Sequence, residues 1–502
     1  MHYQRWMKSA PFALLALSST TIAAPLADPT LLSASEAAKQ ICTKQISSRE
    51  LLDAYVARID SHQNLNAFIT VDMKAARLKA DAYDQRIKNG EACLPLGGVP
   101  IAIKDNIQVV GFPNTAGTPA LKAYLPTKNA PIIDPLENAG AIIVGKANMQ
   151  ELAYGTSGYN TAFHVKDTVG VRNAYDQSRI AGGSSSGSAS AVGARLVAAA
   201  LGTDTGGSVR QPAALNGIVG LRPTVGRYSQ TGITPISPTR DTAGPMARTV
   251  ADVILMDSII TGEKTATPPN VKEIRLGIPN EFWGDLSPEV AARSEAVIKK
   301  LKDAGVKLVP LSMPDIHALN QKVGMPMAFY EGRKSLEHYL SENQTGVELS
   351  KLAAQISSPD VKVLFEKYIL PQKMPGTDGK LVDVADAYKW ATEVGQPEMK
   401  KTYTRAFKEF KLDALIFPTT PDLAIPSNLD STSFKAFGRM IKNTDPGSNA
   451  GLPGISLPIG LAGAANLPVG IELDSLPGTD KELLALALMV EKIVNAQTPP
   501  TK

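Results

Sequence analysis

The chain has 502 residues, of which 43% are hydrophobic and 20% are charged, and its formal net charge is +4. This composition is typical of a globular protein large enough to bury a sizeable core. So small a charge, with no basic cluster or long charge run, gives no argument for binding to nucleic acid or to a membrane surface. We therefore expect no nucleic-acid partner.

The N-terminus has the order of segments found in a secretory signal peptide. Arg5 and Lys8 precede an apolar run over residues 10–17, and small residues follow over 23–27. The apolar run is too short to span a bilayer comfortably. We expect a signal peptide over residues 1–24, export to the periplasm or the medium, and no stable membrane insertion after the signal is removed. An uncleaved N-terminal anchor is the alternative.

The sequence contains two cysteines, Cys42 and Cys93. An exported protein allows them to form a disulfide, and two separate buried thiols are the equal alternative. Neither cysteine has the spacing of a metal or redox motif, and we expect no metal site. The sequence leaves the pairing open.

Capping boxes and apolar runs predict alternating helices and strands in the first half of the chain. Ser33-x-x-Glu36 and Ser47-x-x-Glu50 each place a glutamate three residues after a serine, the pattern that begins a helix. Thr249-x-x-Asp252 begins a further helix that runs to residue 260. Between them, apolar runs predict a buried strand over 99–103, a helix over 132–139, a strand over 141–144, and a packed helix and strand within 189–201.

The second half continues this alternation around a polar segment. Residues 318–410 are mostly helical in pattern, with several Gly and Pro breaks, which is typical of an insertion or cap. We therefore predict one α/β domain over residues 30–495, with a mixed, mainly parallel sheet covered by helices and a helical insertion. Its other predicted elements are strands over 274–278, 306–309, 415–421, 451–457 and 469–473 and helices over 288–304 and 481–493.

Two loops rich in glycine and serine carry the strongest chemical signal. They span residues 182–187 and 202–210 and flank the predicted helix and strand of 189–201. Glycine adopts positive φ angles, which let consecutive N–H groups point toward one centre. Such a nest of amides holds an anion, and an oxyanion forms when a hydroxyl attacks a carbonyl carbon. The pattern therefore indicates acyl transfer by a serine.

Either a histidine or a lysine could act as the general base. A serine hydrolase usually relies on histidine, but His164 alone among the five histidines lies near the serine loops, in a polar context that predicts an exposed loop. A lysine can replace histidine when burial lowers its pKa toward neutrality. Lys104 and Lys146 both follow an apolar strand, and the residues alone do not separate them. A surface lysine at a strand end is the plainer alternative for both.

A short motif points to a different nucleophile. Gly183-x-Ser185-x-Gly187 matches the nucleophile elbow of α/β-hydrolases, which would make the protein an esterase with Ser185 as its nucleophile. That elbow requires a strand directly before it, whereas residues 173–179 predict turn and loop. The match carries little weight in a tract so rich in serine and glycine.

Over nearly its whole mature length the chain resembles the amidase signature family, whose catalytic set is Ser-Ser-Lys. Residues 100–106, which read Pro-Ile-Ala-Ile-Lys-Asp-Asn, resemble the lysine motif of the family, and the two loops resemble its signature region. The resemblance places the lysine at Lys104, the first serine, on a cis peptide bond, at Ser184, and the nucleophile at Ser208. Residues 186–188 depart from the pattern where many members carry a further glycine, and leave these three positions intact.

The resemblance also implies a mechanism without a cofactor. A neutral Lys104 takes a proton from Ser184, which takes one from Ser208, and Ser208 attacks the amide carbon. Asp204 and Arg210 are expected to support the loop rather than to take part in the reaction. The backbone N–H groups expected to hold the oxyanion are those of Thr205, Gly206, Gly207 and Ser208.

Within the family, several stretches resemble the branch of indoleacetamide and mandelamide hydrolases, namely residues 226–232, 236–242, 357–361 and 467–474. This resemblance implies an amidase that hydrolyses the C–N bond of small primary amides of the arylacetamide type, through an acyl-enzyme, to acid and ammonia. A peptide amidase or a broad aliphatic amidase of the same family is the alternative. An exported binding protein without activity is the alternative from another class.

The substrate contacts are less defined than the catalytic set. We expect them from the C-terminal part of the insertion and from the loop that contains Tyr154, Gly155, Thr156 and Ser157. The expected partner is a small-molecule amide. The sequence leaves open whether the protein forms a homodimer.

Overall fold

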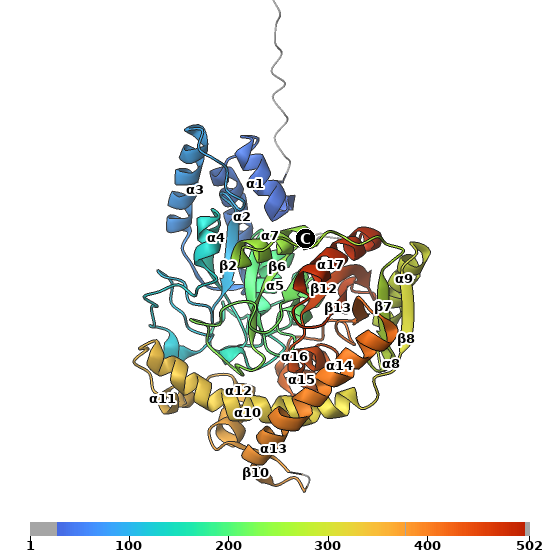
Figure 1. The fold of residues 1–502 in the computed structure, drawn as a ribbon. Helices are drawn as coiled ribbons and strands as arrows, with labels where there is room; N and C mark the ends of the chain where they lie inside the picture. Colours follow the sequence, from blue (N-terminus) through green and yellow to red (C-terminus); the bar gives the residue numbers. More distant parts are fainter. Residues whose placement is uncertain (1–27, 377, 497–502) are drawn as a thin grey trace, which may run out of the picture.

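One long β-sheet forms the centre of the molecule (Figure 1). The computed structural model describes residues 28–376 and 378–496. The signal peptide predicted over residues 1–24 lies outside the described residues. Within the described ranges, no helix combines the length and the apolar character needed to cross a bilayer.

The strands of this sheet include those predicted in both halves of the chain. In chain order they are β1 (Phe68–Val71), β2 (Pro100–Lys104), β3 (Ile142–Ala147), β4 (Ala199–Asp204), β5 (Val219–Arg222), β6 (Thr242–Ala247), β7 (Arg275–Pro279), β8 (Lys307–Leu311), β11 (Ala414–Pro418), β12 (Gly454–Ala462) and β13 (Leu467–Asp474). Their order across the sheet is β1-β3-β2-β4-β6-β5-β12-β13-β11-β7-β8.

Parallel pairing is concentrated in two groups of strands. β2 pairs in parallel with β3 and β4, and β7 pairs in parallel with β8 and β11. The strands between these groups are antiparallel, as is β1 at one edge. The prediction of an α/β fold with a mixed, mainly parallel sheet covered by helices is confirmed in its fold and its mixed sheet; of the ten strand pairings of this sheet in the described residues, four are parallel and six are antiparallel.

Parallel pairing brings the carboxyl ends of β2, β3 and β4 to one edge of the sheet. Lys146 of β3 lies in register with Ile103, the neighbour of Lys104 on β2. Ile103 also lies in register with Leu201 of β4, the strand that ends at Asp204. Every residue of these three strands is buried. Both lysines therefore lie at the carboxyl edge, where α/β sheets commonly bind ligands.

Helices cover both faces of the sheet. Along β2, Ile101 and Ile103 pack on one face and Ala102 packs on the other, as the two-residue period of a strand requires. Lys104 has the parity of Ala102, so its side chain emerges on the second face. The helices on the first face are α1 (Ala34–Cys42), α4 (Asp134–Asn138), α7 (Val250–Thr261), α9 (Pro288–Asp303) and α17 (Asp480–Val494). Those on the second face are α5 (Ser186–Gly193) and α6 (Arg210–Leu215). Two further helices, α2 (Ser48–Ser61) and α3 (Met73–Lys88), contribute residues to both faces.

The helix starts predicted from the capping boxes are confirmed. Ser33 caps α1 and Ser47 caps α2, and in each case the glutamate of the box accepts a hydrogen bond from the N-cap amide. α7 begins after Thr249, whose hydroxyl oxygen accepts a bond from the N–H of Asp252. Local polar spacing therefore sets the ends of these helices, as the sequence indicates.

The two cysteines are joined in a disulfide. Cys42, the last residue of α1, is bonded to Cys93 in the loop before β2, across a sequence separation of 51 residues. The structure therefore decides between the two alternatives that the sequence leaves open. The bond attaches α1 to the body of the sheet.

The segment predicted as a helical insertion runs along the lower side of the molecule in Figure 1. It contains α10 (Ile316–Glu342), α11 (Leu349–Ala354), α12 (Pro359–Leu364), α13 (Ala385–Trp390) and α14 (Gln396–Phe410). Between α12 and α13 it also forms a two-stranded hairpin, β9 (Lys373–Pro375) and β10 (Leu381–Asp383), which the helical prediction did not include. α10 and α14 pack with α8 (Asn280–Trp283) against Leu415 and Phe417 of β11.

Candidate active site

Lys104 is completely buried at the end of β2 and faces two hydroxyl groups. Its Nζ lies 2.7 Å from Ser184 Oγ and 2.7 Å from Thr203 Oγ1. Burial lowers the pKa of Lys104 to about 7, against a smaller opposing effect of Asp204 and Asp241. An amine with this pKa is partly neutral near pH 7 and can accept a proton from a neighbouring hydroxyl.

Lys146 is equally buried but has a different partner. Its Nζ lies 3.4 Å from Asp105 Oδ1 and donates a hydrogen bond to Asn114 Oδ1 at 2.9 Å. Burial lowers its pKa and Asp105 raises it. The pair is an internal salt bridge, and the structure separates the two lysines that the residues alone leave tied, because Lys104 is the one that contacts Ser184.

The loop before α5 carries Ser184 and Ser185 in different roles. The Gly183–Ser184 peptide bond is cis, and Ser184 contacts Lys104. Ser185 is fully buried, its hydroxyl donates to the carbonyl of Thr203 at 3.0 Å, and its oxygen accepts the Thr203 N–H at 3.1 Å. The hydroxyl of Ser185 therefore holds the loop against β4. No strand directly precedes this loop, so the geometry does not match a nucleophile elbow.

Ser208 lies in the loop that follows β4, which Asp204 holds in shape. The N–H of Gly207 donates to Asp204 Oδ1 at 2.8 Å, and the N–H of Val209 donates to Asp204 Oδ2 at 3.1 Å. Gly207 has a φ of +127°, a conformation that favours glycine. The Gly207 amide, which the sequence predicts as an oxyanion donor, thus donates to Asp204 in this structure. No acceptor among the described residues occupies the N–H groups of Thr205, Gly206 or Ser208.

Two buried arginines brace this loop from behind. Arg210 Nε lies 3.1 Å from Asp204 Oδ2, and Arg222 Nη1 lies 3.0 Å from Asp204 Oδ1. Burial alone raises the pKa of Asp204, but the two guanidinium groups outweigh it and hold this pKa below its usual range. Arg210 also pairs with Glu472 of β13. These contacts make Asp204 and Arg210 supports of the loop, as the sequence predicts.

The loops of Ser184 and Ser208 are joined through the backbone, since the N–H of Ser185 donates to the carbonyl of Ser208 at 3.2 Å. The histidines lie elsewhere. His164 is exposed, His338 pairs with Glu342, and none of the histidines in the described ranges bonds to either serine. Those ranges also contain no cluster of three or more histidine, cysteine or acidic side chains that could hold a metal ion.

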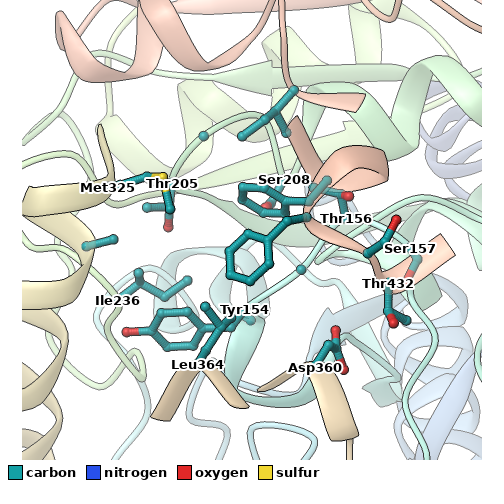
Figure 2. Close-up of a pocket in the computed structure, with 18 of the residues that line it drawn as sticks. Tyr154, Thr156, Ser157, Thr205, Ser208, Ile236, Met325, Asp360, Leu364 and Thr432 are labelled. Carbon is teal, nitrogen blue, oxygen red and sulfur yellow. The ribbon is translucent and has the colours of Figure 1, made fainter. Parts of the chain in front are cut away.

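A cavity of about 400 Å³ lies against Ser208 (Figure 2). The predicted loop lines it with Tyr154, Gly155, Thr156 and Ser157, and Thr205 and Gly206 lie beside Ser208. Ala153, Ile236 and Arg240 also line it. The rest of the lining comes from α10, α12 and residues 429–445, and much of it is apolar. Its apolar members include Met325, Phe329, Val363, Leu364, Phe434 and Phe437.

The source of this apolar wall corrects one expectation. The C-terminal part of the insertion, which comprises α13 and α14, does not line the cavity. α14 packs with α8 against β11, whereas the N-terminal half of α10 runs beside α16 (Asp445–Asn449), next to the loop of Ser208. α15 (Phe434–Met440) was not predicted as part of the site, because a short polar and aromatic helix far along the chain carries no local sign of where it packs.

Comparisons with known proteins agree with this geometry. The family model Amidase matches residues 50–484. A mandelamide hydrolase of Pseudomonas putida is 55% identical over 471 residues, which cover 94% of this chain and 93% of the relative. An indoleacetamide hydrolase of Agrobacterium vitis is 39% identical over 465 residues, which cover 91% of this chain and 96% of the relative.

Solved structures point to the same family. An amidase structure at 31% identity has a TM-score of 0.78 and covers 92% of this chain and 99% of its own. A peptide amidase in complex with the competitive inhibitor chymostatin, at 28% identity, has a TM-score of 0.77 and covers 94% and 99%. The chain therefore belongs to the amidase signature family and is a hydrolase of amide C–N bonds.

Proposed function

We propose that this protein hydrolyses primary amides whose acyl group carries one aromatic ring, as in arylacetamides, and releases ammonia. The observation that carries this proposal is the cavity at Ser208. Its volume of about 400 Å³ and its aromatic and aliphatic walls fit a single ring. The relatives named for mandelamide and indoleacetamide hydrolysis add support, since both names describe amides of arylacetic acids.

We assign Ser208 as the nucleophile and Lys104 as the base that activates it through Ser184. Neutral Lys104 takes the proton of Ser184 while Ser184 takes that of Ser208, and the Ser208 oxygen forms a bond to the amide carbon. The 2.7 Å contact between Lys104 and Ser184 and the position of Ser208 at the cavity support this relay. Preorganised donors for the developing oxyanion are the amides of Thr205, Gly206 and Ser208.

The relay then runs in reverse. The proton held by Lys104 passes back through Ser184 to the amide nitrogen, the C–N bond breaks, and ammonia leaves an acyl-Ser208 ester. A water molecule then takes the place of Ser208 in the same sequence, and its attack releases the carboxylic acid. Each proton removed in the attack is returned to the leaving group, so the enzyme regains its starting state.

The substrate proposal is tested by comparing kcat/KM for phenylacetamide, hexanamide and a C-terminally amidated dipeptide, with ammonia release as the readout. We expect phenylacetamide to be best, with graded preferences, because each misfitting methylene changes discrimination by about 1–3 kcal/mol. Clear superiority of the dipeptide would instead assign a peptide amidase, the alternative that the similarity to the chymostatin-bound peptide amidase favours.

We also propose that the protein is exported. The order of charged, apolar and small residues at the N-terminus and the bond between Cys42 and Cys93 support this proposal, because disulfides persist in oxidising compartments. Cell fractionation followed by mass spectrometry of the mature N-terminus tests it. A cytoplasmic protein that retains residues 1–24 would contradict it.

A further inference from the structure

One charged side chain of the substrate cavity has no charged partner. Three charged residues line the cavity: Arg240, Asp360 and Asp445. Arg240 and Asp445 lie 3.4 Å apart, and Asn320 donates a further bond to Asp445. Asp360 forms no ion pair with any residue in the described ranges. The cavity therefore presents one carboxylate that the protein does not neutralise.

Asp360 is held in place by a chain of side chains. Ser157 donates to Gln150 Oε1 at 3.2 Å, and Gln150 Nε2 donates to Asp360 Oδ2 at 3.0 Å. The start of α12 is fixed as well, because the N–H of Ser358 donates to a carboxylate oxygen of the buried Glu151 at 2.7 Å. These contacts hold Asp360 beside the cavity before any ligand arrives.

The second carboxylate oxygen of Asp360 is unused. Oδ1 is buried and has no hydrogen-bond partner among the described residues. A buried acceptor without a donor costs about 1–3 kcal/mol, and more when it is charged. Burial raises the pKa of Asp360 to about 6, which agrees with an incompletely compensated carboxylate. A ligand donor in the cavity reaches this oxygen when the carboxylate turns toward the cavity, and that contact would remove the cost.

The cavity has a polar side around Asp360 and an apolar side across from it. In Figure 2, Thr156, Ser157, Thr432 and Asp360 lie to the right, whereas Met325, Ile236 and Leu364 lie to the left, with Thr205 above the last two. Ser208 lies at the upper part of the cavity and Asp360 at the lower part in the same view. An acyl ring bound here has one apolar flank and one edge that faces an acceptor.

We propose that Asp360 is a specificity-determining residue, which accepts a hydrogen bond from an O–H or N–H group on the aromatic acyl part of the substrate. This inference rests on the arylacetamide function proposed above and narrows it to ring systems that carry a donor. A ring hydroxyl and a cationic amine can both donate such a hydrogen bond. The apolar flank binds the ring, and the carboxylate of Asp360 selects the substituent at its edge.

The test compares substituents that match in size but differ in their donor. The substrates are 3- and 4-hydroxyphenylacetamide with the corresponding methylphenylacetamides, and 4-(aminomethyl)phenylacetamide with 4-ethylphenylacetamide. In the wild-type enzyme we expect kcat/KM for one hydroxyl isomer or for the amine to exceed that of its size-matched alkyl analogue about 10- to 100-fold, the range of a hydrogen bond to a charged group. In Asp360→Ala this ratio falls to about 1, and in Asp360→Asn it takes an intermediate value.

The hydroxyl and amine substrates together identify which kind of donor Asp360 binds. A ratio that is larger for the amine assigns a cationic ligand, and one that is larger for a hydroxyl assigns a neutral ligand. Asp386→Asn, at an exposed aspartate in α13, is the matched control and leaves every ratio unchanged. An unchanged ratio in Asp360→Ala, or the absence of any donor preference in the wild type, would overturn the proposal.

Failure of the proposed function can be told apart from failure of this inference. Isothermal titration calorimetry gives the Kd of the same amides for the Ser208→Ala variant, with and without Asp360→Ala, and so measures recognition without turnover. If no arylacetamide is hydrolysed but the donor preference in Kd depends on Asp360, the proposed reaction is wrong and the role of Asp360 stands. If hydrolysis occurs and neither kcat/KM nor Kd depends on Asp360, the role of Asp360 is wrong.

Discussion

The ends of β2 and β3 place two lysines in nearly the same setting with different consequences. Lys104 and Lys146 are both fully buried, on adjacent parallel strands, and burial lowers the pKa of both. Lys104 faces the hydroxyls of Ser184 and Thr203, whereas Lys146 faces the carboxylate of Asp105. A carboxylate stabilises the charged amine, and hydroxyls leave it free to be neutral. Burial alone therefore does not make a lysine a base, and the partner decides.

The largest expected effect is the loss of activity on removing the first of these lysines. Lys104→Met removes the proton acceptor, and we expect kcat/KM for phenylacetamide to fall about 10⁴-fold or more. The free energy of unfolding should not fall, since an apolar side chain replaces a buried amine. Ammonia release and urea denaturation measure the two quantities. Activity within about 100-fold of wild type would exclude Lys104 as the base.

The opposite result is expected at the second lysine. Lys146→Met leaves Asp105 buried without its cation, and we expect the free energy of unfolding to fall by about 3–5 kcal/mol. The folded fraction should keep kcat within about tenfold of wild type. Adding Asp105→Asn should restore part of the stability. A stable Lys146→Met protein without activity would reverse the comparison of the two lysines.

The lowered pKa of Lys104 also predicts how activity and stability depend on pH. The neutral form of Lys104 is the active one, so protonation below its pKa of about 7 removes the base. We expect kcat/KM to rise with pH, tenfold per unit below about pH 7, and to level off above it. Because the unfolded chain holds this proton up to about pH 10.4, stability should also rise with pH between these values. A flat profile between pH 5 and 8 would rule out a base with this pKa.

The smallest expected effect concerns histidine. His164→Ala should change kcat/KM less than about twofold, because the side chain of His164 is exposed. The same assays used for Lys104→Met measure it. A loss of several orders of magnitude would replace the lysine relay with a Ser-His arrangement.

Local motifs in the sequence predicted the catalytic region well. The apolar run before Lys104 predicts a buried strand, and the glycine-rich loop after β4 predicts exposed amides near Ser208. Both features follow from a few consecutive residues. The hydrogen bond from the Gly207 amide to Asp204 could not be predicted, because the spacing of residues in a sequence does not indicate which backbone amide a side chain will bind.

The substrate wall was predicted poorly for a physical reason. Tyr154 and its neighbours adjoin the catalytic loops in sequence and were expected at the cavity, where they lie. Phe434, Phe437 and the N-terminal half of α10 reach the cavity through tertiary packing between segments that lie more than 120 residues from the loop of Ser184. No periodic pattern in a single sequence encodes such a contact.

The most direct test of the catalytic assignment is covalent labelling with a serine-reactive arylphosphonate, followed by peptide mass spectrometry. We expect a single adduct on Ser208 in the wild-type protein, and labelling slowed by orders of magnitude in Lys104→Met but unchanged in His164→Ala. An adduct on Ser185, or labelling of Ser208 at full rate without Lys104, would contradict the relay from Lys104 through Ser184 to Ser208.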